Sequence, residues 1–196
     1  MCFRLSLILF FASLLSLGSS RPLPLEVDSL APNFSLQDIE TGQKFELSGY
    51  RGQFVVLEWV NPQCPFVQRH YRSKFLPEMQ RHLKEEGALW FSIYSKNPGG
   101  LLDGELLEFW KNVKGEATAF LVDMGGEVGR SYRARTTPQI FLIDREGRVV
   151  YQGAICSDPH NPRQARNYLE EAFSEAVKGR AVSVSKTTPY GCLIKY

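Results

Sequence analysis

The chain has 196 residues, of which 43% are hydrophobic, 12% aromatic and 22% charged, and its formal net charge is +2. This composition is typical of a folded globular protein and excludes extensive disorder, which requires few aromatic residues and a high net charge. Four cysteines are too few for a disulfide-stabilised scaffold. The near balance of 23 basic and 21 acidic residues creates no field that would attract nucleic acid, so no nucleic-acid partner is expected.

The first twenty residues have the pattern of a secretory signal peptide. Arg4 is followed by an apolar run over 5–17 and by the small residues 18–20. The run is shorter than the roughly 20 apolar residues of a spanning helix, so we expect no membrane span in the mature chain. The alternative is an uncleaved, buried helix. Export to the periplasm or extracellular space is therefore expected, and the secreted chain would keep three cysteines, Cys64, Cys156 and Cys192.

The first half of the remaining chain predicts strands around one long helix. A Pro-rich lead-in is expected over 21–32, a hairpin over 34–39 and 44–47, a fully buried strand over 54–60, and a further strand over 88–95. Apolar residues spaced by four predict a helix from Cys64 to about Glu86, with a kink at Pro77. A helix between two strands is a crossover unit, which implies that the strands are parallel.

The second half predicts shorter elements and one well-marked helix. A short helix is expected over 105–113, a strand over 118–122, helical turns over 126–132, and a hairpin over 139–144 and 148–153. Asn161 is the expected cap of the last helix and Gly179 its end, and the tail over 181–196 has no clear periodicity. This order predicts an α/β fold with a mixed β-sheet flanked by helices.

Cys64 lies where the buried strand ends and the next helix begins. There the free backbone N–H groups and the helix dipole stabilise an anion, which lowers the pKa of a thiol below its usual value of about 8.5. Pro65 suits the first turn of the helix. A buried cysteine that packs as a small hydrophobic residue is the alternative. The strand–Cys–Pro–helix context favours a reactive thiol.

The surrounding motifs resemble a known family. The segment 56–65, VLEWVNPQCP, resembles the active-site strand and loop of the thioredoxin superfamily, and segments 31–36 and 47–53 resemble the opening of its redoxin branch. That branch includes the alkyl hydroperoxide reductases and thiol-specific antioxidant proteins. Thr137-Pro138 is similar to the superfamily's cis-proline segment, and the ending YGCLIKY is similar to that of a peroxiredoxin-like subgroup with Cys-Pro-[Phe/Tyr]-Val. The resemblance implies a thioredoxin-like domain over 33–180 and a tail over 181–196 that carries Cys192.

The departures from these families restrict the chemistry. Val67 occupies the position of the second cysteine in Cys-x-x-Cys, so no second thiol is near Cys64 in sequence. The peroxide-binding Pro and Thr of peroxiredoxins are replaced by Leu57 and Asn61. A resolving thiol must then come from Cys192 or, as a lesser candidate, Cys156. A structural Cys156–Cys192 disulfide, which would leave Cys64 as the single free thiol, is a third possibility.

The resemblance also implies roles for residues around Cys64. Glu58 would lie beneath the reactive cysteine as a proton acceptor, a role that a buried carboxyl group suits because burial raises its pKa. The alternative is that Glu58 points to a solvated edge. Pro65, Thr137 and Pro138 would orient the substrate, with Pro138 in the cis form and the backbone of Thr137 free to pair with a peptide. Arg135 is a possible cation for the Cys64 thiolate.

The combined prediction is an exported thiol-dependent oxidoreductase that acts on a disulfide-bearing protein or a peroxide. It needs an external thiol reductant and no cofactor, and its oligomeric state is left open. The alternative is a non-catalytic module that holds a peptide or a metal in the groove around Cys64 and Pro138. Copper sites of this fold pair a histidine such as His70 with two cysteines, and the second cysteine is missing, so no metal is expected.

Overall fold

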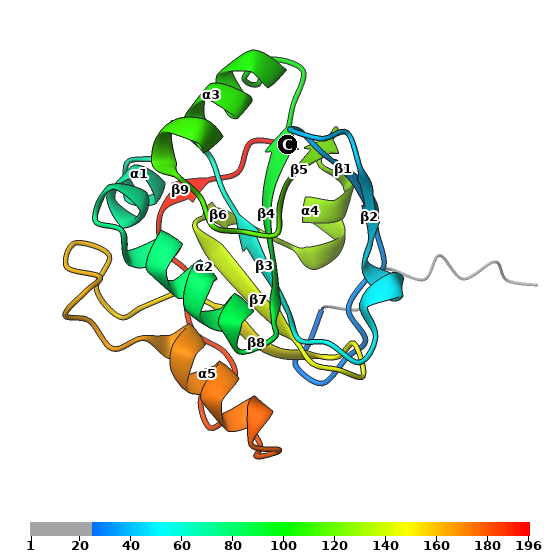
Figure 1. The fold of residues 1–196 in the computed structure, drawn as a ribbon, viewed down its shortest axis with the longest axis vertical. Helices are drawn as coiled ribbons and strands as arrows, with labels where there is room; N and C mark the ends of the chain where they lie inside the picture. Colours follow the sequence, from blue (N-terminus) through cyan, green and yellow to red (C-terminus); the bar gives the residue numbers. More distant parts are fainter. Residues whose placement is uncertain (1–24) are drawn as a thin grey trace, which may run out of the picture.

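The computed structural model describes residues 25–196, so the signal peptide expected over 1–20 lies outside the described residues. The described elements follow in chain order (Figure 1): β1 Ser35–Asp38, β2 Lys44–Glu46, the 3₁₀ helix η1 Leu47–Tyr50, β3 Val55–Trp59, α1 Pro65–Arg72, α2 Phe75–Glu85, β4 Leu89–Lys96, α3 Asp103–Val113, β5 Ala119–Met124, α4 Glu127–Tyr132, β6 Thr136–Thr137, β7 Gln139–Ile143, β8 Val149–Gly153, α5 Tyr168–Val177 and β9 Cys192–Leu193.

Seven of the described strands form one mixed sheet in the order β2-β1-β5-β4-β3-β7-β8. The β3–β4 and β4–β5 pairs are parallel, whereas β7 pairs with β3 and β8 in the antiparallel sense. The predicted parallel crossover and antiparallel closing hairpin are therefore confirmed. Every residue of β3 is buried, as expected for a strand that is covered on both faces.

Two apolar cores lie on opposite faces of the sheet. Val56 and Trp90 pack on one face with residues of α1, α2, α3 and α5, among them Tyr71. Leu57 packs on the other face with Tyr132 of α4 and with the β1–β2 hairpin. Figure 1 shows the same division of the helices around the sheet. Alternate residues of β3 thus enter different cores, so Glu58 points into the core beneath α1.

The long helix expected after Cys64 is two helices. The chain turns at Ser73 and Lys74, and Lys74 adopts a left-handed conformation with φ of 62°. Pro77 lies in the first turn of α2. Backbone N–H groups in a first turn have no acceptor within the helix, so a proline there removes no helical hydrogen bond. The prediction of one helix kinked at Pro77 was wrong because this proline helps to begin a helix instead of bending one.

The last helix begins later than the sequence predicts. Asn167, not Asn161, is the cap of α5, and its side chain accepts a hydrogen bond from the Glu170 amide at 3.2 Å. The preceding segment forms a turn in which Asn161 accepts backbone bonds from residues 164 and 165. That segment also pairs back with the chain after β8, through the bridge between Cys156 and Asn167. Tertiary pairing therefore replaces the first helical turns that the apolar pattern suggested.

The described part of the lead-in contains a turn rather than being extended throughout, since Asp28 has φ of 68° and Leu30 forms a bridge with Arg148.

No helix within residues 25–196 is long and apolar enough to cross a membrane.

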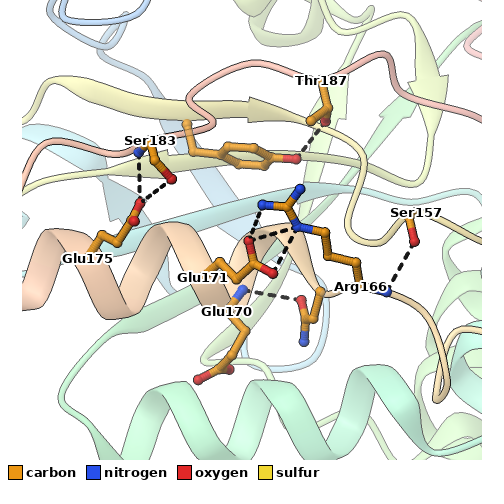
Figure 2. Close-up of polar contacts among 9 residues, drawn as sticks. Ser157, Arg166, Glu170, Glu171, Glu175, Ser183 and Thr187 are labelled. Carbon is orange, nitrogen blue, oxygen red and sulfur yellow. Dashed lines mark hydrogen bonds and ion pairs between the residues drawn. The ribbon is translucent and has the colours of Figure 1, made fainter.

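The chain after α5 is bound along the surface of the domain. Glu175 of α5 accepts hydrogen bonds from the amide and hydroxyl of Ser183, and Thr187 lies 2.6 Å from the Tyr151 hydroxyl (Figure 2). Lys186 forms a parallel bridge with Gln152 of β8. The chain then pairs with β6 and ends with Tyr196 against Gly126 and Gly129 at the start of α4, and the red segment of Figure 1 follows this path past β6. The aperiodic tail is therefore an ordered part of the fold.

One buried carboxylate connects α4 to the central strands. Asp123 is 1% exposed and accepts hydrogen bonds from the amides of Val128 and Gly129 and from the Ser95 hydroxyl, at 2.7–3.1 Å. Ser95 in turn accepts a bond from the Trp59 indole at 3.1 Å. This chain of bonds holds the end of β3 in place next to Cys64.

Replacing Asp123 by Ala should therefore destabilise the protein by about 3 kcal/mol, because it leaves buried donors without an acceptor. Urea unfolding followed by tryptophan fluorescence measures the change. Glu127→Ala is the matched control, since it removes an exposed carboxylate from the first turn of α4, the helix that Asp123 holds, and should cost less than about 1 kcal/mol. Equal effects of the two substitutions would contradict this account.

Candidate functional site

Cys64 caps the N-terminus of α1. Its backbone is extended, with φ of −76° and ψ of 120°, and its carbonyl accepts the first backbone bond of the helix from Gln68 at 3.0 Å. The Cys64 amide donates to the Asn61 carbonyl at 2.9 Å, which closes the turn between β3 and α1. Cys64 is 1% exposed. The thiol is thus placed at the positive end of the helix dipole, as the sequence predicted.

The Thr137–Pro138 peptide bond is cis, as expected, and this segment lies against Cys64. The Cys64 thiol donates a hydrogen bond to the Thr137 carbonyl oxygen at 3.0 Å. The hydroxyl group of Thr137 is buried and has no hydrogen-bond partner among the described residues. In the reduced protein the Thr137 carbonyl is therefore the acceptor that positions the Cys64 thiol.

Cys192 lies on the other side of the same segment. β9 pairs with β6 in the antiparallel sense, with Cys192 opposite Thr137 and Leu193 opposite Thr136. The side chain of Cys192 lies beside the Cys64 thiol, and each thiol shifts the pKa of the other. The expectation that the backbone of Thr137 is free was wrong, because the chain's own tail pairs with it.

The two thiols have opposite acidities. Burial acts to raise the pKa of Cys64, but hydrogen bonds from the Cys192 thiol and from the backbone amides of Val67 and Cys192 outweigh it, so this pKa is lowered. Burial raises the pKa of Cys192 to about 11, and its hydrogen bond to Cys64 and the charge of Cys64 act in the same direction. Cys64 is therefore the more acidic thiol of the pair and Cys192 the less acidic one.

Glu58 is fully buried on the core face beneath α1. One carboxylate oxygen accepts hydrogen bonds from the side chains of four residues at 2.9–3.2 Å: Tyr71, Gln80, Trp90 and Ser92. The other oxygen has no partner among the described residues. Burial raises the pKa of Glu58 to about 7 despite these hydrogen bonds. The carboxyl group can thus exchange a proton near neutral pH, although its hydrogen bonds go to this cluster and not to Cys64.

Cys156 is free and buried, and it belongs to a different cluster. Its sulfur lies 3.1 Å from the Tyr190 hydroxyl, which also lies 3.0 Å from Nε2 of His70. Burial raises the pKa of Cys156, and burial together with the nearby Arg69 charge lowers the pKa of His70 to about 4. The structure brings Cys192, and not Cys156, to Cys64. A Cys156–Cys192 disulfide is absent, because both thiols are free.

Of the two remaining predicted site residues, Pro65 lies beside the thiol, whereas the side chain of Arg135 has no described contact with it. Pro65 is the first residue of α1 and is exposed beside the thiol. Arg135 is exposed, and the contacts that the structure describes for it are made by its backbone: its amide donates to the Gln139 side chain, and its carbonyl accepts from Ile194. The guanidinium is not among the groups that shift the pKa of Cys64.

Sequence reasoning missed two residues that position the site. Gly191 has φ of 116°, and a Cβ atom there would lie 2.0 Å from the Thr137 carbonyl oxygen, so only glycine allows β9 to approach β6. Tyr190 links the tail to α1 through His70. The sequence signal for both was the ending Tyr-Gly-Cys itself, in which a glycine directly precedes a cysteine.

A pocket of about 290 Å³ opens beside the two thiols. Cys64, Cys192 and Thr137 line it together with residues from β3, the β3–α1 turn, β4, the β4–α3 connection and the tail: Trp59, Val60, Asn61, Gln63, Tyr94, Ser95, Asn97, Gly99, Gly100, Leu193, Ile194 and Lys195. No lining residue is acidic, and amide side chains provide much of its polarity.

The acidity of Cys64 should depend on Cys192. Cys192→Ala removes the thiol that donates to Cys64 and should move the titration of Cys64 to higher pH. Cys192→Ser, which keeps a donor, should move it less. The rate of iodoacetamide alkylation at Cys64 as a function of pH, with the site located by peptide mass spectrometry, measures the shift. Identical profiles for the three proteins would contradict the assigned hydrogen bond.

The buried carboxyl group of Glu58 should make stability depend on pH. The folded state keeps the proton up to a pH of about 7, whereas the unfolded state loses it near the ordinary value of 4.5. Stability should therefore fall by ~3 kcal/mol as the pH rises from about 4 to about 8. Glu58→Gln should flatten this decrease in urea unfolding. An equally steep decrease in the variant would assign it to another group.

Comparisons with known proteins identify relatives of this chain. A thiol-disulfide oxidoreductase ResA from Bacillus thuringiensis subsp. konkukian is 27% identical over 128 residues, which cover 65% of this chain and 69% of the relative. A ResA from Bacillus anthracis matches to the same extent. These two relatives match this chain over most of their own length.

Solved structures show the same fold. An uncharacterized conserved protein from Geobacillus kaustophilus has a TM-score of 0.78 at 21% identity, covering 88% of this chain and 93% of that one. A putative thiol:disulfide interchange protein DsbE from Chlorobium tepidum has a TM-score of 0.60 at 23% identity, covering 79% and 97%. The Redoxin family model matches residues 26–169, well over half of the chain. The chain therefore belongs to the Redoxin family, within the thioredoxin superfamily.

Proposed function

We propose that this protein is a thiol–disulfide oxidoreductase in which Cys64 and Cys192 form the redox pair. The observation that carries the proposal is that two free thiols lie side by side at the N-terminus of α1, one with a lowered and one with a raised pKa. The lowered pKa makes Cys64 the thiol that ionises more readily and attacks first, and Cys192 lies where it can attack the resulting mixed disulfide. The names of the ResA relatives, which are thiol-disulfide oxidoreductases, support the same activity.

The reaction proceeds in two exchange steps. The Cys64 thiolate attacks one sulfur of the substrate disulfide, which forms a mixed disulfide with Cys64 and releases the first substrate thiolate. Cys192 then loses its proton and attacks the Cys64 sulfur, which forms the Cys64–Cys192 disulfide and releases the second thiolate. Both released thiolates take up protons. The protein is oxidised and the substrate reduced, and an external thiol reverses the oxidation.

The other predicted site residues assist these steps. Glu58, with a pKa of about 7, accepts and returns protons on the face of the sheet beneath α1. Thr137 and Pro138 hold the sulfur of Cys64 and set the direction from which a substrate approaches, since the Thr137 carbonyl already accepts the thiol. Pro65 fixes the backbone of the first turn of α1 directly after the thiol, because its φ suits the first helical position.

Disulfides are favoured over peroxides as substrates, because Leu57 and Asn61 stand where peroxiredoxins carry their peroxide-binding Pro and Thr. A peroxide would instead convert Cys64 to a sulfenic acid before Cys192 resolves it. The lowered pKa of Cys64 favours catalysis over a non-catalytic binding module, because a lowered pKa makes a thiol more reactive. The signal-peptide pattern of residues 1–20 supports action in an exported, oxidising environment.

Disulfide mapping of intact protein tests the proposal. Reduced protein treated with stoichiometric oxidised glutathione should form a Cys64–Cys192 disulfide, and Cys192→Ser should accumulate a glutathione adduct at Cys64. Cys64→Ser should lose at least 100-fold in the rate of disulfide reduction, because the nucleophile is gone, while Cys156→Ala, the control, should retain the wild-type rate.

A parallel reaction with hydrogen peroxide separates the two substrate classes. A slower formation of the Cys64–Cys192 bond with peroxide than with glutathione disulfide supports the proposal, and a faster one indicates a peroxidase. Full activity of Cys64→Ser would overturn any thiol mechanism at this site.

A further inference from the structure

The last residues of the described chain pair with the edge of β6 that lies beside Cys64. We call residues 190–196 the tail strand. Its pairing with β6 is extended by a hydrogen bond from the Ile194 amide to the Arg135 carbonyl at 2.9 Å. The strand edge beside the reactive thiol is therefore already paired, by a segment that carries its own cysteine.

Tyr190 anchors the first end of the tail strand. Its ring stacks on His70 of α1 at a centroid distance of 5.8 Å and packs against Phe66 at 6.1 Å. Its hydroxyl lies within hydrogen-bond distance of His70 Nε2 and the Cys156 sulfur. One aromatic side chain thus fixes the tail strand to both α1 and the segment after β8.

Tyr196 anchors the other end. Its hydroxyl donates to the Ala134 carbonyl at 2.6 Å, and the Arg130 guanidinium lies 4.8 Å from its ring centre. The ring occupies space that a Cβ atom at Gly126 or Gly129 would fill, since that atom would lie 2.3 Å or 2.5 Å from the tyrosine. The α4 region is therefore shaped to receive this side chain.

These anchors decide how a substrate reaches Cys64. An extended polypeptide binds a sheet by pairing with an exposed strand edge, and the tail strand shows that β6 accepts such a segment with its cysteine next to Cys64. With the tail strand in place, that edge is unavailable. The pocket of about 290 Å³ still reaches Cys64, and the tail strand forms one of its walls. A volume of this size is at the lower limit for small-molecule sites.

We propose that the tail strand is an internal substrate mimic that restricts Cys64 to small-molecule disulfides while it is bound to β6 and excludes polypeptide disulfides. This inference rests on the proposed thiol–disulfide exchange and adds its substrate class. In each exchange the small disulfide enters through the pocket and is reduced to two thiols, while Cys64 and Cys192 are oxidised to a disulfide. The tail strand does not leave β6 during the reaction.

The test compares two disulfides on two proteins. The small probe is bis(2-hydroxyethyl) disulfide, whose hydroxyl groups suit an amide-lined pocket without acidic residues. The peptide probe is the disulfide dimer of the heptapeptide YGCLIKY, the sequence of the tail strand itself. Acid-quenched samples analysed by mass spectrometry give the second-order rate constant for consumption of each disulfide by the reduced protein.

Gly191→Ala releases the tail strand without removing Cys192. Its new Cβ atom would collide with the Thr137 carbonyl at a backbone φ of 116°. Gly87→Ala is the matched control, because Gly87 also has a positive φ of 86° but no neighbouring atom within 4 Å and lies far from the site in the α2–β4 turn. Tyr196→Ala, which removes the second anchor, is an independent variant should Gly191→Ala fold poorly.

The wild type and Gly87→Ala should consume the small disulfide at least tenfold faster than the peptide disulfide. In Gly191→Ala and Tyr196→Ala the ratio of the peptide rate to the small-disulfide rate should rise at least tenfold, because release of the tail strand frees the edge of β6. The ratio is the readout, since the same release moves Cys192 away from Cys64 and acts on both reactions. Hydrogen exchange at the Ile194 amide, measured by NMR, should be slow in the wild type and faster in the two variants.

Other outcomes identify what fails. Equal rates of the wild type with both disulfides, or a ratio of peptide rate to small-disulfide rate that release of the tail strand does not raise, would overturn the substrate restriction and leave the proposed function intact. Exchange of the Ile194 amide at the rate of an unstructured peptide in the wild type would also overturn it. Loss of reaction at Cys64 with both disulfides in every protein would overturn the proposed function as well.

Discussion

The contact between the Cys64 thiol and the Thr137 carbonyl joins the two halves of this fold. Cys64 comes from the end of β3, at the start of α1, and Thr137 comes from the cis-proline segment 73 residues later. The two meet because β3 and β7 are neighbouring antiparallel strands, so that the end of one strand faces the beginning of the other. The site, the pocket and the position of the tail all depend on this contact between distant segments.

Buried polar groups keep this region in place from both faces of the sheet. On one face Glu58 collects four donors from α1, α2 and β4 on one oxygen, which ties these elements to β3. On the other face Asp123 holds the start of α4 and, through Ser95, the indole of Trp59. A buried carboxylate is costly unless it is hydrogen-bonded, so both groups favour one arrangement of the elements around them.

The second thiol comes from a place that local motifs do not reveal. In a Cys-x-x-Cys protein one helical turn brings the resolving sulfur to the nucleophile, and here Val67 occupies that position within the core. Strand pairing between β6 and β9 performs the same task, with Gly191 allowing the close approach and Tyr190 and Tyr196 fixing the ends. The arrangement makes the pKa difference between the two thiols a property of tertiary contacts, since burial and their mutual hydrogen bond produce it.

The sequence by itself determined the α/β class, the parallel crossover around β3 and the position of Cys64 at a helix start, because these follow from local periodicity and from motifs of adjacent residues. The cis form of Pro138 was implied by the resemblance to the thioredoxin superfamily, and the structure confirms it. The apolar pattern predicts one helix kinked at Pro77, but the helix breaks earlier, at Lys74, which adopts a left-handed conformation. The pattern also places the start of α5 too early, because the pairing of Cys156 with Asn167 overrides it there. Only the tertiary structure decided which cysteine meets Cys64 and that the backbone of Thr137 is already paired. Those outcomes depend on contacts between residues far apart in the chain, and a single sequence contains no local signal for their distance in space.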